Sequence, residues 1–479
     1  MNGHDSGEDM SPIISQHYLG EVGSSCVHGQ ELQTEKDGSS VFKIKNKRSG
    51  FKLKDLPRWK IIMLAILCFA STLLEMWFSL LGPFFPRVAY SKGVSYTVIG
   101  IIFASFEIPM FISSPVFGSL ISTIGPKFML VSGLFICAAC SVLFGFLDGS
   151  PPGNTFIALS IATRCVEALG YSAFYVSSRA IVGYVFRDNV AMIYGILNIF
   201  TGLGDMLGYP LGGVLFELGG FGMPFWSVGI AMLVCTGVAF MFTPSQYGSL
   251  VTQSRSFIGL FKSPIVCIAC WCQLCFAMRL SVVETTYAVY IEKAFGFSPL
   301  WIGLLYLAPV SSFAIIAPVC AWIVDKKGYC TLFLAVVPFV AAITLMLWGP
   351  SPLLKPLKPS IVMNCVFGVV SGATLGSMYI STIGCILIGV KELGYDDSLD
   401  THGLVSSCYI TFTTAGFFSG AVFGGVMTQH AGFEWSLTVI AGLYVTCGTL
   451  ALGLLLYRYM KDVTSKKNED SPDILLLTK

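Results

Sequence analysis

The chain has 479 residues, of which 54% are hydrophobic and only 12% are charged. Soluble globular proteins carry about 25% charged residues, so this composition excludes an ordinary soluble domain and indicates a membrane protein. The formal net charge is only +2, and we expect no nucleic-acid partner.

The chain begins with a polar segment, residues 1–58, that we expect to be a disordered cytosolic tail without a signal peptide. Two short acidic segments, residues 9–14 and 470–475, are similar to dileucine-type sorting signals, although chance explains them equally well. They slightly favour an intracellular vesicle or endolysosomal membrane over the plasma membrane.

Twelve stretches of about 20 mostly apolar residues follow, and each is long enough to span a bilayer as a helix. Lys and Arg lie mainly on the side that carries both termini, which the positive-inside rule places in the cytosol. The predicted helices are 61–83, 98–121, 128–147, 155–178, 190–215, 224–243, 265–290, 300–324, 331–349, 361–388, 403–427 and 436–457.

A glycine-rich segment late in the fifth predicted helix recurs late in the eleventh. Glycine at every fourth position leaves one helix face bare, so a second backbone can approach closely. Internal repeats in an apolar chain are typical of transporters built from two similar halves. The glycines are Gly204, Gly208, Gly212 and Gly213 in the first copy and Gly416, Gly420 and Gly424 in the second.

We therefore predict an all-α membrane protein with 12 transmembrane helices in two pseudo-symmetric six-helix bundles. The bundles comprise residues 59–243 and 265–457. A short cytosolic loop, 244–264, connects them, and a cytosolic tail, 458–479, follows.

The loops after the second and eighth predicted helices carry related motifs. They read Gly118-x3-Ser122-x2-Gly125-x-Lys127 and Ala321-x3-Asp325-Lys326-Lys327-Gly328. Both resemble the G-x3-D-x2-G-x-[RK] signature of the major facilitator superfamily, with Ser122 and Ala321 as departures. The resemblance implies a charge latch between helices at the cytosolic surface.

Two further motifs resemble the same superfamily. In the fourth helix Arg164-x2-Glu167 resembles R-x2-Q-G; because a buried arginine is costly, we expect it to face the bundle interior and to pair with Glu167. In the fifth, Gly204-x3-Gly208-x-Pro210-x-Gly212-Gly213 resembles the G-x3-G-P-x2-G-G motif of proton-coupled antiporters, with Tyr209 in place of the proline and Pro210 one position later. That motif implies a pivot between the halves. The alternative for Arg164 and Glu167 is a purely structural ion pair, and the alternative for the glycine motif is simple close packing of helices.

Longer stretches narrow the resemblance to the vesicular amine transporters (solute carrier family 18), and within them to the polyamine-transporter-like member. These stretches are 82–86, 125–129, 143–148 and 432–435. The similarity covers about residues 60–457. It implies alternating access around a midplane site that binds an organic cation and protons. The family's first- and seventh-helix acids correspond to Glu75 and Glu284, whereas its tenth- and eleventh-helix acids have no counterpart.

The charges within the predicted spans are mostly acids. Unpaired carboxylates in a low-dielectric core take up protons or await a cation, which suits exchange of a cation for protons. All five histidines lie outside the spans, so an intramembrane proton carrier must be a carboxylate. The acids are Glu75, Glu107, Glu167, Asp205 and Glu284, and the bases are Arg164 and Arg279.

Glu284 is the first candidate for binding the substrate ammonium or a proton, with an ion pair to Arg279 as the alternative. Glu75 is the second candidate, and nearby Trp77 either faces lipid or forms a cation–π contact. Glu107 either lines the same cavity or stabilises a kink at the following Pro109. Asp205 is expected to bond across helices, and Arg164 to act in coupling or cavity electrostatics.

The sixteen cysteines suggest neither disulfides nor a metal site. Cys267, Cys270, Cys272 and Cys275 lie within one apolar helix, where we interpret them as small packing residues rather than zinc ligands. We expect no cofactor.

We predict a secondary active transporter, a proton-coupled antiporter of an organic cation such as a polyamine or another amine, acting as a monomer in the lipid bilayer. One alternative is a carrier of a neutral or anionic metabolite, in which the acids belong to structural networks. Another is a membrane sensor or scaffold that does not transport. The loops carry no hydrolytic or redox constellation, so we do not expect an enzyme.

Overall fold

The computed structural model describes residues 56–186, 190–244, 257–354, 358–395 and 399–469. Within these ranges the chain forms helices and short connections and no strand. The predicted disordered tail, most of the central loop and the two acidic segments resembling sorting signals lie outside the described residues.

The first half of the chain forms eight helices around one hydrophobic core, whose residues run from Met63 to Cys235 with Ala421 added from the second half. A 3-10 turn (Leu147–Gly149) connects the fifth and sixth. The helices are α1 (Arg58–Leu80), α2 (Phe85–Ser91), α3 (Tyr96–Ala104), α4 (Glu107–Ile124), α5 (Pro126–Gly145), α6 (Asn154–Val185), α7 (Val190–Gly219) and α8 (Gly222–Phe242).

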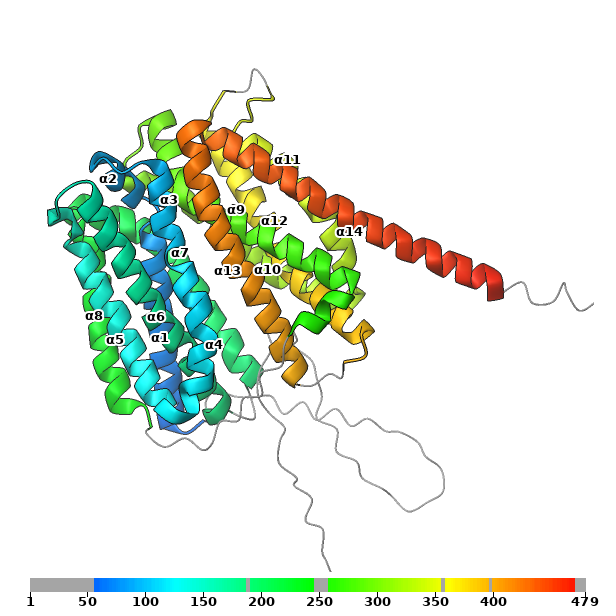
Figure 1. Cartoon of the computed structure of the whole chain (residues 1–479), viewed down its shortest axis with the longest axis horizontal. Helices are drawn as coiled ribbons and strands as arrows, with labels where there is room; N and C mark the ends of the chain where they lie inside the picture. Colours follow the sequence, from blue (N-terminus) through cyan, green and yellow to red (C-terminus); the bar gives the residue numbers. More distant parts are fainter. Residues whose placement is uncertain (1–55, 187–189, 245–256, 355–357, 396–398, 470–479) are drawn as a thin grey trace, which may run out of the picture.

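The second half forms six long helices around a second core, which runs from Leu260 to Ala451 and takes in Tyr209 from the first half. A 3-10 segment (Phe257–Lys262) precedes them. Figure 1 shows the two sets of helices beside each other, blue to green on the left and green to red on the right. The helices are α9 (Pro264–Phe295), α10 (Pro299–Lys327), α11 (Cys330–Trp348), α12 (Ile361–Glu392), α13 (Leu399–His430) and α14 (Phe433–Glu469).

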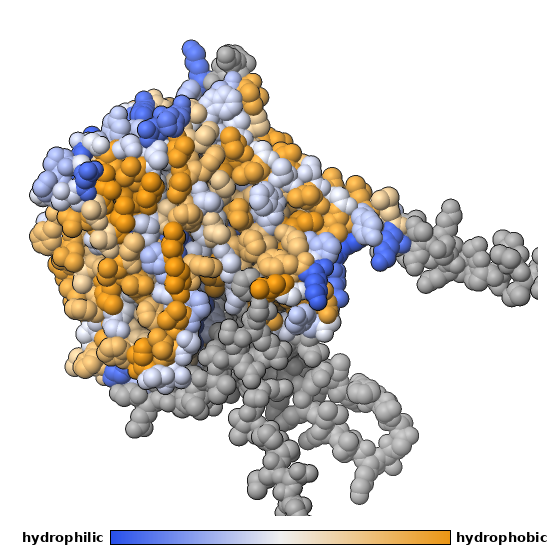
Figure 2. Space-filling model, viewed as in Figure 1, coloured by the Kyte–Doolittle hydropathy of each residue, from blue (hydrophilic) through white to orange (hydrophobic). Residues whose placement is uncertain are grey.

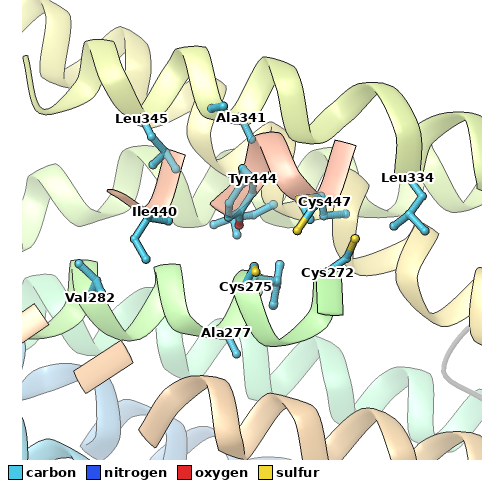
Figure 3. Packing of buried hydrophobic residues seen from close by; sticks show 14 of the residues in the cluster. Cys272, Cys275, Ala277, Val282, Leu334, Ala341, Leu345, Ile440, Tyr444 and Cys447 are labelled. Carbon is cyan, nitrogen blue, oxygen red and sulfur yellow. The ribbon is translucent and has the colours of Figure 1, made fainter. Parts of the chain in front are cut away.

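Cysteines serve as packing residues in this second core. Figure 3 shows Cys272 and Cys275 of α9 and Cys447 of α14 among aliphatic side chains of α11. The four clustered cysteines of α9 do not converge on one point: Cys270 Sγ lies 3.3 Å from Cys408 Sγ of α13, and Cys267 is exposed.

Eleven helical segments of the described chain are long and apolar enough to cross a membrane, with α3 and α4 counted as one. The remaining predicted span, 155–178, corresponds to α6, which has 32 residues and packs against α4 and α5. Its buried polar residues lower its hydropathy. In Figure 2 hydrophobic side chains are frequent on the visible face of the helices and hydrophilic ones gather near its ends, as expected for a surface in contact with lipid.

Several helix boundaries differ from the prediction. The segment expected as one helix over 98–121 is broken between Ala104 and Glu107, because Pro109 has no N–H to donate to the Ser105 carbonyl. The thiol of Cys165 on α6 donates to that carbonyl instead, at 3.4 Å. The short helix α2 was not predicted, and α14 continues to Glu469, well beyond the predicted start of the tail at 458.

The glycine repeat brings helix backbones together in both halves, so the predicted close approach is confirmed. A Cβ added at Gly204 would lie 2.3 Å from the Thr72 carbonyl oxygen of α1. In the second half, a Cβ added at Gly420 would lie 2.4 Å from the Met278 carbonyl oxygen of α9. Gly208 and Gly212 likewise face α1, and Gly416 and Gly424 face α9.

The adjacent glycine in each copy faces the other half of the chain. A Cβ at Gly213 would meet the Pro299 carbonyl oxygen of α10 at 2.4 Å, and one at Gly425 would meet the Tyr96 carbonyl oxygen of α3 at 2.5 Å. The two copies therefore make equivalent contacts: each packs against one helix of its own half and against one helix of the other half.

Polar bridges join the halves at the end of the molecule that carries α2. Arg87 Nε lies 3.1 Å from Glu292 Oε1, and the Thr97 hydroxyl donates to Gln429 Oε1 at 2.6 Å. The backbone N–H of Leu300 donates to Glu217 at 3.2 Å. The halves are thus held together at the α2 end.

Candidate substrate and ion-coupling site

A cavity lies among α1, α6 and α7, and Glu75 of α1 is part of its wall. The phenol O–H of Tyr171 on α6 donates to Glu75 Oε1 at 2.5 Å. Among the described residues no cationic group lies within ion-pair distance of the Glu75 carboxylate. The residues that line the cavity are Ser71, Leu74, Glu75, Tyr171, Phe174, Tyr175, Ser178, Arg179, Leu197 and Thr201.

Arg179 occupies the same cavity and is held by aromatic rings. Its guanidinium carbon lies 4.3 Å from the ring centre of Tyr175 and 5.3 Å from that of Tyr194. Tyr379 of α12, in the other half, lies within electrostatic range of Arg179. We call Tyr175 and Tyr194 the tyrosine cage. The predicted fourth span ended at residue 178, but α6 continues to Val185, so Arg179 joins Arg164 and Arg279, the two bases expected within the spans.

Arg164 and Glu167 form the predicted ion pair on α6, with Nη1 and Oε2 3.1 Å apart and both side chains at most 5% exposed. The guanidinium also lies 5.1 Å from the ring of Trp77 and 4.8 Å from that of Phe106. Trp77 is only 2% exposed, so its predicted lipid-facing alternative is wrong: its ring is buried against Arg164 and the aromatic core.

Glu107 begins α4, directly after the break between α3 and α4. Its side chain is buried and lies within electrostatic range of Arg164. It therefore belongs to the surroundings of the Arg164–Glu167 pair, two residues before Pro109. Glu107 is not among the residues that line the cavity at Glu75, and its role at the kink stays a prediction.

Glu284 of α9 is buried, and its Oε1 has no hydrogen-bond partner among the described residues. Asp205, Glu107 and Glu75 lie within its electrostatic range, as does Arg164. We call Glu75, Glu107, Asp205 and Glu284 the interface carboxylates. They come from α1, α4, α7 and α9, so both halves of the chain contribute.

Two tyrosines connect the halves beside these carboxylates. The rings of Tyr209 on α7 and Tyr306 on α10 stack with centres 4.4 Å apart and planes 7° from parallel. The Tyr306 hydroxyl donates to the carbonyl of Val283 at 3.2 Å. Tyr209 is the residue that replaces proline in the antiporter-like motif, and Pro210 lies next to it within α7.

Arg279 is not placed with the interface carboxylates, although we grouped it with them. Its Nη2 donates to the Ser371 carbonyl at 2.9 Å and to the Ser371 hydroxyl, and Nη1 donates to Thr374 Oγ1 at 3.4 Å. The ring of Tyr444 lies 5.8 Å away. An ion pair between Arg279 and Glu284 is therefore absent within the described residues.

The two loop motifs form sharp turns between helices. Gly125 has φ +89° between α4 and α5, and Gly328 has φ +68° after α10, values that glycine adopts readily. Lys127 Nζ lies 5.2 Å from the ring of Phe240, and Lys326 Nζ lies 5.0 Å from that of Trp322. Gly118 has open space around it, and the Asp325 side chain lies outside the described part, so the charge latch stays a prediction.

Residues 67–392 match the family model described as Major Facilitator Superfamily. The chain belongs to this superfamily. Its members are transporters and not enzymes, as predicted for this chain. The structure of a bacterial homolog of the human lysosomal transporter Spinster shares the fold, with a TM-score of 0.69 at 12% identity over 83% of this chain and 97% of that one.

Similar proteins identify the family within this superfamily to which the chain belongs. It is 33% identical over 401 residues to the MFS-type transporter SLC18B1 of Homo sapiens, covering 84% of this chain and 86% of the relative. It is 26% identical over 358 residues to the chromaffin granule amine transporter of Rattus norvegicus, covering 72% and 64%. The predicted relationship to solute carrier family 18 is confirmed, and the chain is a multi-pass membrane transporter.

Sequence reasoning missed Tyr171, Arg179 and the Tyr209–Tyr306 stack. Tyr171 lies only four residues from Glu167 on the same helix, and this spacing was the available signal, since residues four apart on a helix share a face. No sequence signal pointed to Tyr306.

Proposed function

We propose that this transporter exchanges an organic cation for protons, with a polyamine or another amine as substrate. The observation that supports this most is the group of interface carboxylates. Glu75, Glu107 and Asp205 lie within electrostatic range of Glu284, and the Glu284 Oε1 atom has no hydrogen-bond donor among the described residues. Ammonium groups and protons are the natural ligands of carboxylates in such a low-dielectric site.

Several carboxylates suit a substrate with several ammonium groups better than one with a single charge. The names of the related chromaffin granule and synaptic vesicular amine transporters support the amine class. Protonation of the carboxylates weakens their hold on the cation, so an acidic compartment on the far side drives release there. We place the protein as a monomer in an intracellular vesicle or endolysosomal membrane, with both termini in the cytosol.

The polar bridges at the α2 end support a conformation in which the site is closed on the lumenal side. In this orientation α2 lies on the non-cytosolic side of the membrane, so the cation enters from the cytosol. The two halves then rock about the glycine contacts of α7 and α13 to expose the site to the lumen.

The test is uptake by proteoliposomes with an acidic interior, using spermidine, a monoamine and an organic anion as probes. We expect uptake of an amine that stops when the proton gradient is collapsed. Amine uptake that persists without the gradient would exclude antiport, and uptake of the anion alone would exclude the cation.

Glu284→Gln tests the site itself. A hydrogen bond to a charged group contributes about 1.5–3 kcal/mol, and 1.4 kcal/mol is a factor of ten in affinity, so we expect coupled uptake to fall at least about tenfold. Glu392→Gln is the matched control, because Glu392 pairs with Arg458 on the surface at 2.8 Å and its side chain is 42% exposed. Equal uptake by the two variants would show that Glu284 is not part of the site.

A further inference from the structure

The tyrosine cage already holds a cation, the guanidinium of Arg179. Tyr175 and Tyr194 present their rings at 4.3 and 5.3 Å, within the range of cation–π contacts. Among the described residues no carboxylate lies within ion-pair distance of Arg179. Aromatic faces surround this charge, and the Glu75 carboxylate lies within its electrostatic range without forming an ion pair with it.

One ring of the cage, that of Tyr175, borders the cavity that contains Glu75. Tyr175 and Arg179 both line it, and Tyr171, which donates to Glu75, stacks on Tyr175 with ring centres 6.2 Å apart. A carboxylate next to aromatic faces is the combination that recognises an alkylammonium ion. Arg179 thus lies where an ammonium group of a substrate would bind.

The other half of the chain borders the cage as well. Tyr379 of α12 lies within electrostatic range of both Tyr175 and Arg179, and its ring packs edge-on against Tyr409 of α13 at 5.9 Å. The environment of the guanidinium therefore changes when the two halves move relative to each other.

We propose that Arg179 is a tethered competitor of the transported cation. The guanidinium occupies the tyrosine cage of the empty carrier, and a substrate ammonium binds there only after the arginine side chain has swung out. The apparent affinity is then reduced by the fraction of time for which the cage is vacant. Return of the arginine helps to expel the cation after transport. This inference rests on the proposed transport of an organic cation.

Arg179→Gln leaves the cage open, so we expect the Kd for spermidine to fall about three- to tenfold, the range that loss of one cation–π competitor predicts. The measurement is equilibrium binding of radiolabelled spermidine to the purified full-length protein. Arg58→Gln, at an exposed arginine at the start of α1, is the control and leaves the Kd unchanged.

A double-mutant cycle separates competition from simple charge removal. If Arg179 competes for the rings, Arg179→Gln tightens binding in the Tyr175→Phe background, which keeps the ring, and has no effect in the Tyr175→Leu background. If the effect were a long-range charge effect, binding would tighten equally in both backgrounds, and the inference would be overturned.

Two further results distinguish this inference from the proposed function. If Arg179 were a fixed counter-ion needed to hold the site together, Arg179→Gln would weaken binding while the wild type still bound spermidine; only the tethered competitor would then be rejected. If the wild type bound neither spermidine nor a monoamine in a saturable manner, the proposed function would fail and the inference with it.

Discussion

Substituting Gly204 by alanine tests whether close contact between α1 and α7 stabilises the first half. The added Cβ would lie 2.3 Å from the Thr72 carbonyl oxygen and 3.0 Å from the Thr72 Cα, both rigid backbone atoms. Ordinary contact begins at 3.4 Å, so the two helices must separate locally by about 1.1 Å. The hydrogen bond from the Thr72 hydroxyl to the Phe200 carbonyl, 3.0 Å long, joins the same helices and would be strained.

Gly202→Ala is the matched control, because a Cβ at Gly202 meets no atom within 4 Å. Both substitutions gain the same helix propensity, at most about 1 kcal/mol, which cancels in the comparison. The difference that remains is the overpacking penalty, which should lower the stability of Gly204→Ala by about 1–3 kcal/mol relative to Gly202→Ala. We expect a lower Tm for Gly204→Ala than for Gly202→Ala when the two proteins are unfolded by heat in the same detergent. Equal Tm values would refute the inference that this contact is tight.

Three further predictions concern stability. Arg164→Gln should destabilise the protein by about 3–5 kcal/mol, because it leaves the buried Glu167 carboxylate without its cation. Adding Glu167→Gln should restore part of this stability, as measured by denaturant unfolding. No recovery in the double variant would contradict the prediction. Arg87→Gln should cost less than about 1 kcal/mol, since the ion pair with Glu292 is exposed, and a larger drop in Tm would show that the bridge is shielded from water. Gly420→Ala should lower the Tm as Gly204→Ala does, because its Cβ would meet a carbonyl oxygen at 2.4 Å; a Tm equal to that of the wild type would show that the two copies of the repeat pack differently.

Tyr171→Phe tests the hydrogen bond at Glu75. Removing the hydroxyl leaves the cavity shape unchanged but deprives the carboxylate of its donor at 2.5 Å. Because a hydrogen bond to a charged group contributes about 1.5–3 kcal/mol, proton-driven spermidine uptake should change its pH dependence while the protein remains folded. An unaltered pH profile would show that Glu75 takes no part in coupling.

The spacing of residues along single helices predicted much of this structure. Glycines four apart predicted the bare faces of α7 and α13, and Arg164 and Glu167 three apart predicted their own ion pair. Both arguments need only the geometry of one helix. They could therefore be made before any helix was placed beside another.

The remainder of the site depends on contacts between distant segments. Tyr171 meets Glu75 across 96 positions, and the partners of Arg279 lie on α12, more than 90 positions away. Tyrosine and arginine are amphipathic, so neither hydropathy nor periodicity shows which way their side chains face. Arg179 was missed because the fourth predicted helix ended at residue 178, although aromatic rings surround its guanidinium inside the fold.

The parallel rings of Tyr209 and Tyr306 affect how the two halves can move. Planes only 7° apart can slip past each other with little loss of contact area, whereas pulling them apart exposes both faces. The stack therefore resists separation of the halves far more than it resists shear between them. At this depth in the membrane, the relative motion of the halves should be a slide along the ring planes, while any opening of the molecule takes place nearer its ends.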